Sequence, residues 1–334
     1  MKALITLPQG EIFDSFISEE TLKLLEKNFQ LEMNEMDRNF TPEELYQRGR
    51  DADILITGWG TPSLKSAGFY EKNNNLKMLA HTGGSVADYV DDDAYKIGIK
   101  IVSANKMYAE STAEGALSYI LSGLRYIPDD VYSMHGNYWV SPYKTRGLLY
   151  KNVGVIGVGA VAKKLMEYLK PFNVKIRVYD RYKVDEEVLK SVNGTQTTLE
   201  ELLENSDIIS LHLALNESNK GFFGEKEFKM MKKGALFVNT SRGPIVDEEA
   251  LINELKKNRI NAVLDVYTKE PLSNDSPLRK MKNVYLIPHK AGPAYDYRSV
   301  IGYKIATEAV SFKEGKPLLY EIPLEQAKRM TKHS

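Results

Sequence analysis

The sequence predicts an α/β protein with two doubly wound parallel sheets, and three observations lead to this prediction. The chain has 334 residues, which exceeds the size that one hydrophobic core normally reaches. Short apolar runs alternate with helix-like segments through residues 1–104. The same alternation begins again near Leu148, after a long helical segment. Strand–helix–strand alternation at this spacing is typical of parallel sheets covered by helices.

The first alternating region contains short strands and three helices. The expected strands are 3–7, 52–57, 76–80 and 99–102, and the expected helices are 19–28, 41–50 and 87–97. Thr41 with Glu44 three residues later matches a capping box at the start of the second helix. The acidic run 91–93 indicates a solvated helix start.

The rest of the chain repeats this alternation after one long helix. That helix is expected at 111–125, because apolar residues recur there at helical spacing. The polar and aromatic stretch 128–146 indicates a loop or lid, and 295–314 is expected to form a helix with one apolar face. Between them, the expected strands are 153–156, 175–179, 208–213, 235–239, 262–266 and 284–287, with a helix at 160–169.

Charge and cysteine content limit the function classes. Lys and Arg together number 45 and so do Asp and Glu, and this neutral balance argues against a nucleic-acid-binding protein. The absence of cysteine excludes disulfides, thiolate zinc sites and a cysteine nucleophile. No apolar run approaches the ~18 residues of a membrane span. We therefore expect a cytoplasmic protein without a metal site that binds neither nucleic acid nor membrane.

Residues 157–162 carry the pattern G-x-G-x-x-A, with Gly157, Gly159 and Ala162 at the defining positions. The first glycine allows a tight turn, the second lets the backbone approach a pyrophosphate, and the small third residue lets helix and strand pack closely. The helix that begins here directs free amides at the anion. A glycine-rich turn in another α/β unit is the alternative. The apolar strand before the motif and the amphipathic helix after it favour dinucleotide binding.

The strand after this motif ends at Asp180, 23 residues beyond Gly157. An acid at that spacing holds the ribose hydroxyls of NAD and repels the 2′-phosphate of NADP. Arg181 and Lys183 argue the other way, because either cation suits a phosphate. On balance the sequence favours NAD.

Three polar residues follow later strands: Arg242, Glu270 and His289. Ligands of open α/β sheets bind at the carboxyl ends of the strands, so we expect these residues to converge there. Arg242 can grip a carboxylate, His289 can exchange a proton near neutral pH, and Glu270 can hold the imidazole in its charged form. Together they suit reduction of a keto acid. Each also has a structural alternative, as a salt-bridge arginine, a surface glutamate before proline and a histidine that only bonds its surroundings.

From about residue 76 to residue 317 the sequence resembles the D-isomer-specific 2-hydroxyacid dehydrogenases. Residues 239–251 match N-x-[SA]-R-G-x-[VI]-[VI]-D-x-x-A-L, residues 265–271 match D-V-[FY]-x-x-E-P, and residues 288–292 match P-H-x-[AG]-G. Together these motifs are highly specific. The resemblance implies that Arg242, Glu270 and His289 are the catalytic triad.

The resemblance also implies which residues bind the cofactor. Thr240 and Arg242 would line it, and Asp265 would face the nicotinamide carboxamide. Ala214 stands where the family usually has proline. The other implied cofactor-binding residues are Gly157, Gly159, Ala160, Val161, Asp180, Leu213 and Asn219.

The implied substrate loop departs from the family pattern. The family usually reads G-x-G-x-D-N-[IV]-D, whereas here Val86 stands in place of the second glycine. The resemblance implies that the amides of Ser85 and Val86 bind the substrate carboxylate together with Arg242. Lys290 follows His289 where an apolar or small residue is commoner, and we expect its side chain to point to solvent.

By resemblance, the chain places a Rossmann-type cofactor domain, residues 105–291, inside a flavodoxin-like substrate domain, residues 1–104 and 292–334. A homodimer built on the helix at 111–125 is also implied. The expected activity is hydride transfer between NAD(H) and a 2-keto acid/D-2-hydroxy acid pair, with a small-molecule acid as the substrate.

Other functions remain open at this point. Within the family, the chain is alternatively a phosphoglycerate dehydrogenase or a glyoxylate/hydroxypyruvate reductase; formate dehydrogenases fit less well, because they pair the histidine with glutamine. Outside enzymes, an NAD-sensing binding protein or corepressor shares the fold and triad. An FMN-binding flavodoxin-like module fits the alternation but leaves the triad unexplained.

Overall fold

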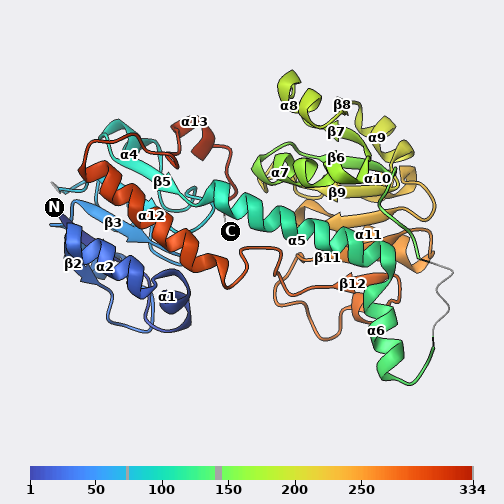
Figure 1. Ribbon diagram of the computed structural model, residues 1–334, viewed down its shortest axis with the longest axis horizontal. Helices are drawn as coiled ribbons and strands as arrows, with labels where there is room; N and C mark the ends of the chain where they lie inside the picture. Colours follow the sequence, from blue (N-terminus) through green and yellow to red (C-terminus); the bar gives the residue numbers. More distant parts are fainter. Residues whose placement is uncertain (73–74, 140–144, 333–334) are drawn as a thin grey trace. The chain divides into compact units, whose positions relative to one another are not determined.

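The computed structural model describes residues 1–72, 75–139 and 145–332, which form two compact units (Figure 1). The first unit comprises Met1–Tyr108 and Pro293–Ser334, and the second comprises Ala109–Gly292. Each contains one parallel sheet with helices on both faces, so the predicted fold class is confirmed. No helix in the described part of the chain is long and apolar enough to cross a membrane.

The first unit has a five-stranded sheet in the order β2-β1-β3-β4-β5. Its strands are β1 Lys2–Ile5, β2 Gln30–Met33, β3 Ile54–Thr57, β4 Met78–His81 and β5 Lys100–Ser103. Its helices are α1 Glu11–Phe16, α2 Glu19–Asn28, α3 Pro42–Gly49, α4 Asp92–Lys96, α12 Tyr297–Lys313 and α13 Leu324–Ala327. Ile5 and Ile56 face α12, whereas Leu4 and Leu55 face the opposite side. Burial of both faces explains why these strands are apolar throughout.

The structure confirms one predicted helix start here and corrects another. Thr41 and Glu44 form the predicted capping box at α3. The helix expected at 87–97 is wrong in extent, because α4 covers only Asp92–Lys96. The Asp91 side chain accepts the amide of Asp93 at 3.1 Å and so begins the helix five residues late. Strand β2 was not predicted, because this short, partly exposed edge strand has no apolar run.

The second unit has a seven-stranded sheet in the order β12-β11-β10-β9-β6-β7-β8. Its strands are β6 Asn152–Ile156, β7 Lys175–Tyr179, β8 Gly194–Gln196, β9 Ile208–Leu211, β10 Leu236–Asn239, β11 Asn261–Leu264 and β12 Val284–Leu286. Its α-helices are α6 Ile127–His135, α7 Ala160–Leu169, α8 Glu186–Ser191, α9 Leu199–Asn205, α10 Glu225–Met230 and α11 Glu248–Lys256, with short 3-10 turns at Lys170–Phe172, Gly243–Ile245 and Pro277–Lys280. Strand order reverses at β6, which creates the crevice where ligands bind in such sheets.

Helix α5, Asn105–Arg125, begins in the first unit and continues into the second. It starts six residues before the predicted 111, where the Ser103 hydroxyl accepts the amide of Asn105 at 3.2 Å. The loop predicted at 128–146 is wrong at its start, since 128–135 belong to α6. Pro128 and Asp129 suit the first turn of a helix, which explains the difference. Residues 140–144 lie outside the described part of the chain.

Candidate active site

Most residues of the second unit that the sequence singled out lie where strands end. Gly157 follows β6 and Asp180 follows β7. Leu213 and Ala214 come just after β9, Thr240 and Arg242 after β10, Asp265 after β11, and His289 after β12. Because all seven strands are parallel, their carboxyl ends lie together along one side of the sheet, and these residues lie there. One sheet thus presents the glycine motif and the polar residues on the same side.

His289 and Glu270 form a hydrogen-bonded pair on this side of the sheet. His289 Nδ1 and Glu270 Oε2 are 2.7 Å apart. The second oxygen of Glu270 accepts the backbone amide of Tyr267 at 3.0 Å, which fixes the direction of the carboxylate. The imidazole is 46% exposed, so Nε2 on its other side remains available to a ligand.

The backbone at His289 is held by Asp265. His289 has φ 49°, a left-handed conformation that side chains with a Cβ adopt at a cost of roughly 1–2 kcal/mol. Its amide donates to the carbonyl oxygen of Asp265 at 2.9 Å. The Asp265 carboxylate accepts the amides of Lys290 at 2.7 Å and Ala291 at 3.0 Å. These bonds stabilise the turn that presents the imidazole; the Lys290 residue itself is exposed, as expected.

Tyr119 on α5 joins this network, and sequence reasoning missed it. Its hydroxyl donates to Asp265 Oδ1 at 3.1 Å. Burial raises the pKa of Tyr119, and the neighbouring Asp265 charge raises it further. A tyrosine on a largely apolar helix gives no sign of a partner far along the chain, so only the fold reveals the contact.

Arg242 lies on a loop that passes very close to the loop carrying Glu270. The next residue is Gly243, where an added Cβ would lie 1.9 Å from the carbonyl carbon and oxygen of Tyr267. Only glycine allows this approach. The Arg242 guanidinium also donates to the carbonyl oxygen of Ser241 at 2.7 Å, which keeps the half-buried side chain close to its own loop.

The glycine motif is shaped as the sequence requires. Gly157 has φ 86°, and an added Cβ would lie 2.9 Å from the Leu213 backbone nitrogen. Gly159 precedes α7, and nothing lies within 4 Å of the position of its missing Cβ. Ala160 is exposed and Val161 partly buried in the first turn of this ten-residue helix. An anionic group can therefore approach the helix start directly.

Two polar groups at the carboxyl ends of the strands also fit a dinucleotide. Asp180 Oδ2 accepts the amide of Val158 at 2.8 Å, which places the carboxylate next to the glycine turn. Thr240 is 7% exposed, and its hydroxyl has no hydrogen-bond partner among the residues that the structure describes. A bound cofactor would offer this hydroxyl a partner.

Asn219 and Ala214 shape the loop after β9. Asn219 Nδ2 donates to the carbonyl oxygen of Ala214 at 2.5 Å, and its Oδ1 accepts the amide of Asn216 at 2.9 Å. Asn219 is buried, so its side chain is used in holding this loop.

The predicted substrate loop lies in the first unit. Val86 is fully buried, with its side chain in the core beneath the sheet. Ser85 Oγ donates to the carbonyl oxygen of Thr331 at 2.7 Å and accepts the amide of Ala87 at 3.3 Å. The valine that replaces glycine therefore packs inward. Across residues 1–72, 75–139 and 145–332 no group of His, Asp and Glu side chains is arranged to hold a metal.

Comparison with known proteins places this site in context. Residues 117–291 match the model of the family described as "D-isomer specific 2-hydroxyacid dehydrogenase, NAD binding domain". The chain is 30% identical over 306 residues to a glyoxylate reductase of Korarchaeum cryptofilum, covering 90% of this chain and 91% of that one. It is 30% identical to a D-3-phosphoglycerate dehydrogenase of Methanocaldococcus jannaschii over 95% of this chain but 58% of the relative. A glyoxylate reductase structure from Paecilomyes thermophila has the same fold, with a TM-score of 0.78, 23% identity, and coverage of 97% of this chain and 99% of that one.

Proposed function

Because the chain belongs to the D-isomer specific 2-hydroxyacid dehydrogenase family, we propose that Arg242, Glu270 and His289 are its catalytic residues. The chain is an NAD-dependent oxidoreductase that transfers a hydride between NAD(H) and a 2-keto acid/D-2-hydroxy acid pair. The corepressor alternative is set aside, because the similar curated proteins carry reductase and dehydrogenase names. The observation that carries the proposed roles is the 2.7 Å contact between His289 Nδ1 and Glu270.

The reaction needs a proton donor, a carboxylate anchor and an oriented imidazole. A bound NADH would supply a hydride for the second carbon of the keto acid. His289 donates a proton from Nε2 to the carbonyl oxygen as the alkoxide charge develops, and removes it in the reverse direction. Glu270 holds Nδ1 and stabilises the imidazolium. Arg242 binds the substrate carboxylate with its planar guanidinium and polarises the carbonyl.

The residues at the carboxyl ends of the strands suit NAD. We assign the pyrophosphate to the amides at Gly157, Gly159, Ala160 and Val161, and the adenosine ribose to Asp180. Thr240 and Asp265 would meet the nicotinamide half, and Leu213 and Ala214 the adenosine half. Asn219 would act indirectly by holding Ala214.

For the substrate, we favour a small unphosphorylated 2-keto acid such as glyoxylate. Several archaeal glyoxylate reductases are similar to this chain, with 27% to 31% identity over about 90% of its length. We assign substrate binding also to the amides of Ser85 and Val86. Residues 105–291 would form the cofactor domain, and 1–104 with 292–334 the substrate domain.

We further propose a cytoplasmic homodimer. Helix α6 exposes the apolar side chains of Ile127, Val131 and Met134, and Tyr132 is 83% exposed. A second copy that covers them would remove this apolar surface from water. The lack of cysteine suits a reducing compartment.

The test is a set of initial rates with NADH and NADPH against glyoxylate, hydroxypyruvate, pyruvate, 2-ketoisocaproate and phosphohydroxypyruvate. We expect the highest kcat/KM with glyoxylate or hydroxypyruvate. Arg242→Lys keeps the charge but loses the paired hydrogen bonds, so KM for the best keto acid should rise about tenfold or more while NADH affinity stays unchanged. Lys190→Gln on α8 is the control. Equal KM values for Arg242→Lys and the unmodified protein would show that Arg242 is structural.

A further inference from the structure

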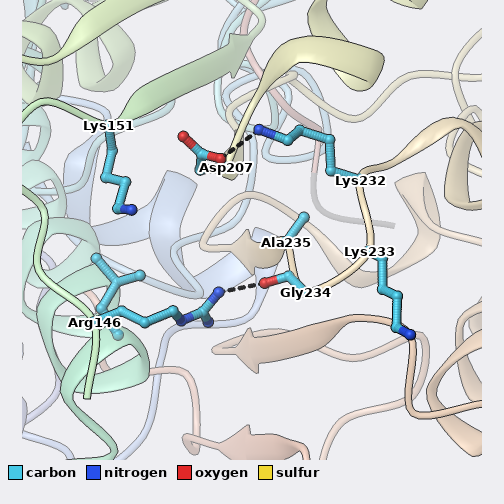
Figure 2. Close-up of a pocket in the computed structure, with 8 residues that line it drawn as sticks. Arg146, Lys151, Asp207, Lys232, Lys233, Gly234 and Ala235 are labelled. Carbon is cyan, nitrogen blue, oxygen red and sulfur yellow. Dashed lines mark hydrogen bonds and ion pairs between the residues drawn. The ribbon is translucent and has the colours of Figure 1, made fainter. Parts of the chain in front are cut away.

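A cavity of about 90 Å³ lies in the second unit, at the amino ends of its strands. The glycine motif lies at the opposite, carboxyl ends. The walls of the cavity include Arg146, Lys151, Asp207, Lys232, Lys233 and Gly234 (Figure 2). Lys151 precedes β6, Asp207 precedes β9, and Gly234 comes two residues before β10. These are the amino ends of the strands whose carboxyl ends carry the residues assigned above to the cofactor and substrate. The cavity is therefore separate from the active site.

Asp207 is the one carboxylate among the described residues that line this cavity, and its charge is already neutralised. Asp207 Oδ1 accepts Lys232 Nζ at 2.6 Å, and Oδ2 accepts the backbone amide and the side-chain amide of Asn152 at 3.0 and 3.3 Å. Burial raises the pKa of Asp207, but these hydrogen bonds outweigh it and hold the pKa below its ordinary value. Asp207 thus compensates only Lys232.

Within the described part of the chain, the other three cations, Arg146, Lys151 and Lys233, have no carboxylate partner. The Arg146 guanidinium donates through Nη1 to the carbonyl oxygen of Gly234, while Nε and Nη2 are buried and have no acceptor within the described ranges. A buried donor left unpaired costs about 1–3 kcal/mol. No ion pair of Lys151 or Lys233 is present among the residues described. In Figure 2 the Arg146 guanidinium and the Lys151 ammonium turn toward the middle of the cavity, whereas Lys233 turns outward.

The size and charge of the cavity define what it can take. A cavity needs about 10–15 Å³ by this measure to hold one water, so this one holds a group of several heavy atoms. It is far smaller than the roughly 300–1,000 Å³ of a site for a nucleotide-sized molecule. Three uncompensated cations favour a doubly charged anion over a singly charged one. A guanidinium fork with adjacent ammonium groups is a common phosphate-binding arrangement.

We propose that this cavity binds a small tetrahedral oxyanion, either free phosphate or the terminal phosphate of a small metabolite. Lys151 contributes a point charge, and Lys233 attracts the anion at the exposed rim. Arg146 contributes paired hydrogen bonds once its guanidinium turns to bring the buried Nε and Nη2 onto the anion. A bound anion satisfies the buried guanidinium nitrogens and ties the loop before β6 to the loop before β10. It should therefore also stabilise the fold by mass action.

The experiment is a calorimetric titration of the full chain with inorganic phosphate at constant ionic strength. Saturating NADH is present throughout, so that the pyrophosphate site is filled. We expect one phosphate per chain and a rise in Tm with phosphate. Arg146→Gln and Lys151→Gln should each raise the Kd about tenfold or more and abolish the rise in Tm. Lys190→Gln, the same change in charge on α8, should leave both unchanged.

A parallel titration with glycerol 3-phosphate separates the two sources. Binding of both compounds identifies a site open to a phosphorylated metabolite, and binding of phosphate alone identifies a site for the free ion. Circular dichroism of each variant excludes loss of the fold as the cause. An unchanged Kd in both Arg146→Gln and Lys151→Gln, or displacement of phosphate by a keto acid, would overturn the proposal.

Discussion

The hydroxyl of Tyr119 lies 3.1 Å from Asp265 Oδ1, and the same carboxylate holds the two amides that follow His289. An ionised carboxylate has about four acceptor positions, and these three donors fill all but one. One position remains for an additional donor, such as the nicotinamide carboxamide. Tyr119 therefore couples helix α5 to the orientation of Asp265 and, through the backbone, to His289.

Tyr119→Phe should lower kcat about tenfold with a smaller change in KM for the keto acid. A hydrogen bond to a charged group contributes about 1.5–3 kcal/mol, and its loss lets the Asp265 carboxylate turn away from the His289 loop. Steady-state kinetics with NADH measure both constants. Tyr95→Phe removes a comparable hydroxyl, which bonds the carbonyl oxygen of Ile322, and should keep full activity. Equal kcat values for the two variants would contradict a positioning role for Tyr119.

His289→Gln should lower kcat in both directions by about 10²–10⁴, the range that a positioned acid–base group supplies. NADH binding should persist, because the residues assigned to the cofactor's pyrophosphate and adenosine lie at other strand ends. Initial rates measure kcat in each direction, and a fluorescence titration with NADH measures the binding of the cofactor. His135→Gln on α6 serves as the control. Retention of more than about a tenth of the activity would exclude His289 as the acid.

Asp180 should set the preference for NADH over NADPH. Asp180→Asn keeps an oxygen that can accept the Val158 amide but removes the charge, so it should narrow the ratio of kcat/KM values mainly by improving NADPH. Asp180→Ala also loses the turn contact and should weaken both cofactors. Two nearby cations are engaged already: Arg181 donates to Ser218 at 3.4 Å and Lys183 pairs with Glu186 at 3.1 Å. If the unmodified enzyme uses NADPH as well as NADH, the prediction fails.

His212 should make the fold less stable in mild acid. Burial lowers the pKa of His212 from 6.5 to about 4. Between these values the unfolded chain binds a proton that the folded histidine rejects, so the free energy of unfolding falls as pH drops from 6.5 toward 4. The effect is on the order of 3 kcal/mol at its largest.

His212→Gln should make the free energy of unfolding depend less on pH between 6.5 and 4. Urea unfolding at a series of pH values measures this dependence. His135 is exposed, so His135→Gln should leave the pH dependence of the free energy of unfolding unchanged. A slope that is the same in all three proteins would mean that another group is responsible.

Local sequence patterns predict many of the strands and the candidate site residues of this protein. The strands at β6, β7 and β10 were predicted within a residue or two, because each is a short apolar run. Gly157 is predicted from the G-x-G-x-x-A motif, and its φ of 86° is one that favours glycine. Arg242, Glu270 and His289 were recognised because each follows a strand in a specific motif.

Other features depend on contacts between distant residues, which a linear pattern does not record. Val86 stands where the family usually has a glycine in the predicted substrate loop, but only its packing against the first sheet shows that the side chain turns inward. Helix α6 was expected as a loop, since its apolar residues are exposed and give no buried face to recognise. Edge strands β2 and β8 contain no continuous apolar run and are stabilised by pairing with β1 and β7.

The sequence by itself determined the family, the parallel sheets and the three residues proposed as the triad, because these follow from short-range periodicity and from residues adjacent in the chain. Only the tertiary structure decided that Tyr119 holds Asp265 and that Arg146 lies with Lys151 and Asp207 around one cavity. Hydrogen bonds and charge compensation depend on distances of a few ångströms between side chains. Those distances are established only when the strands pair and the helices pack on the sheet.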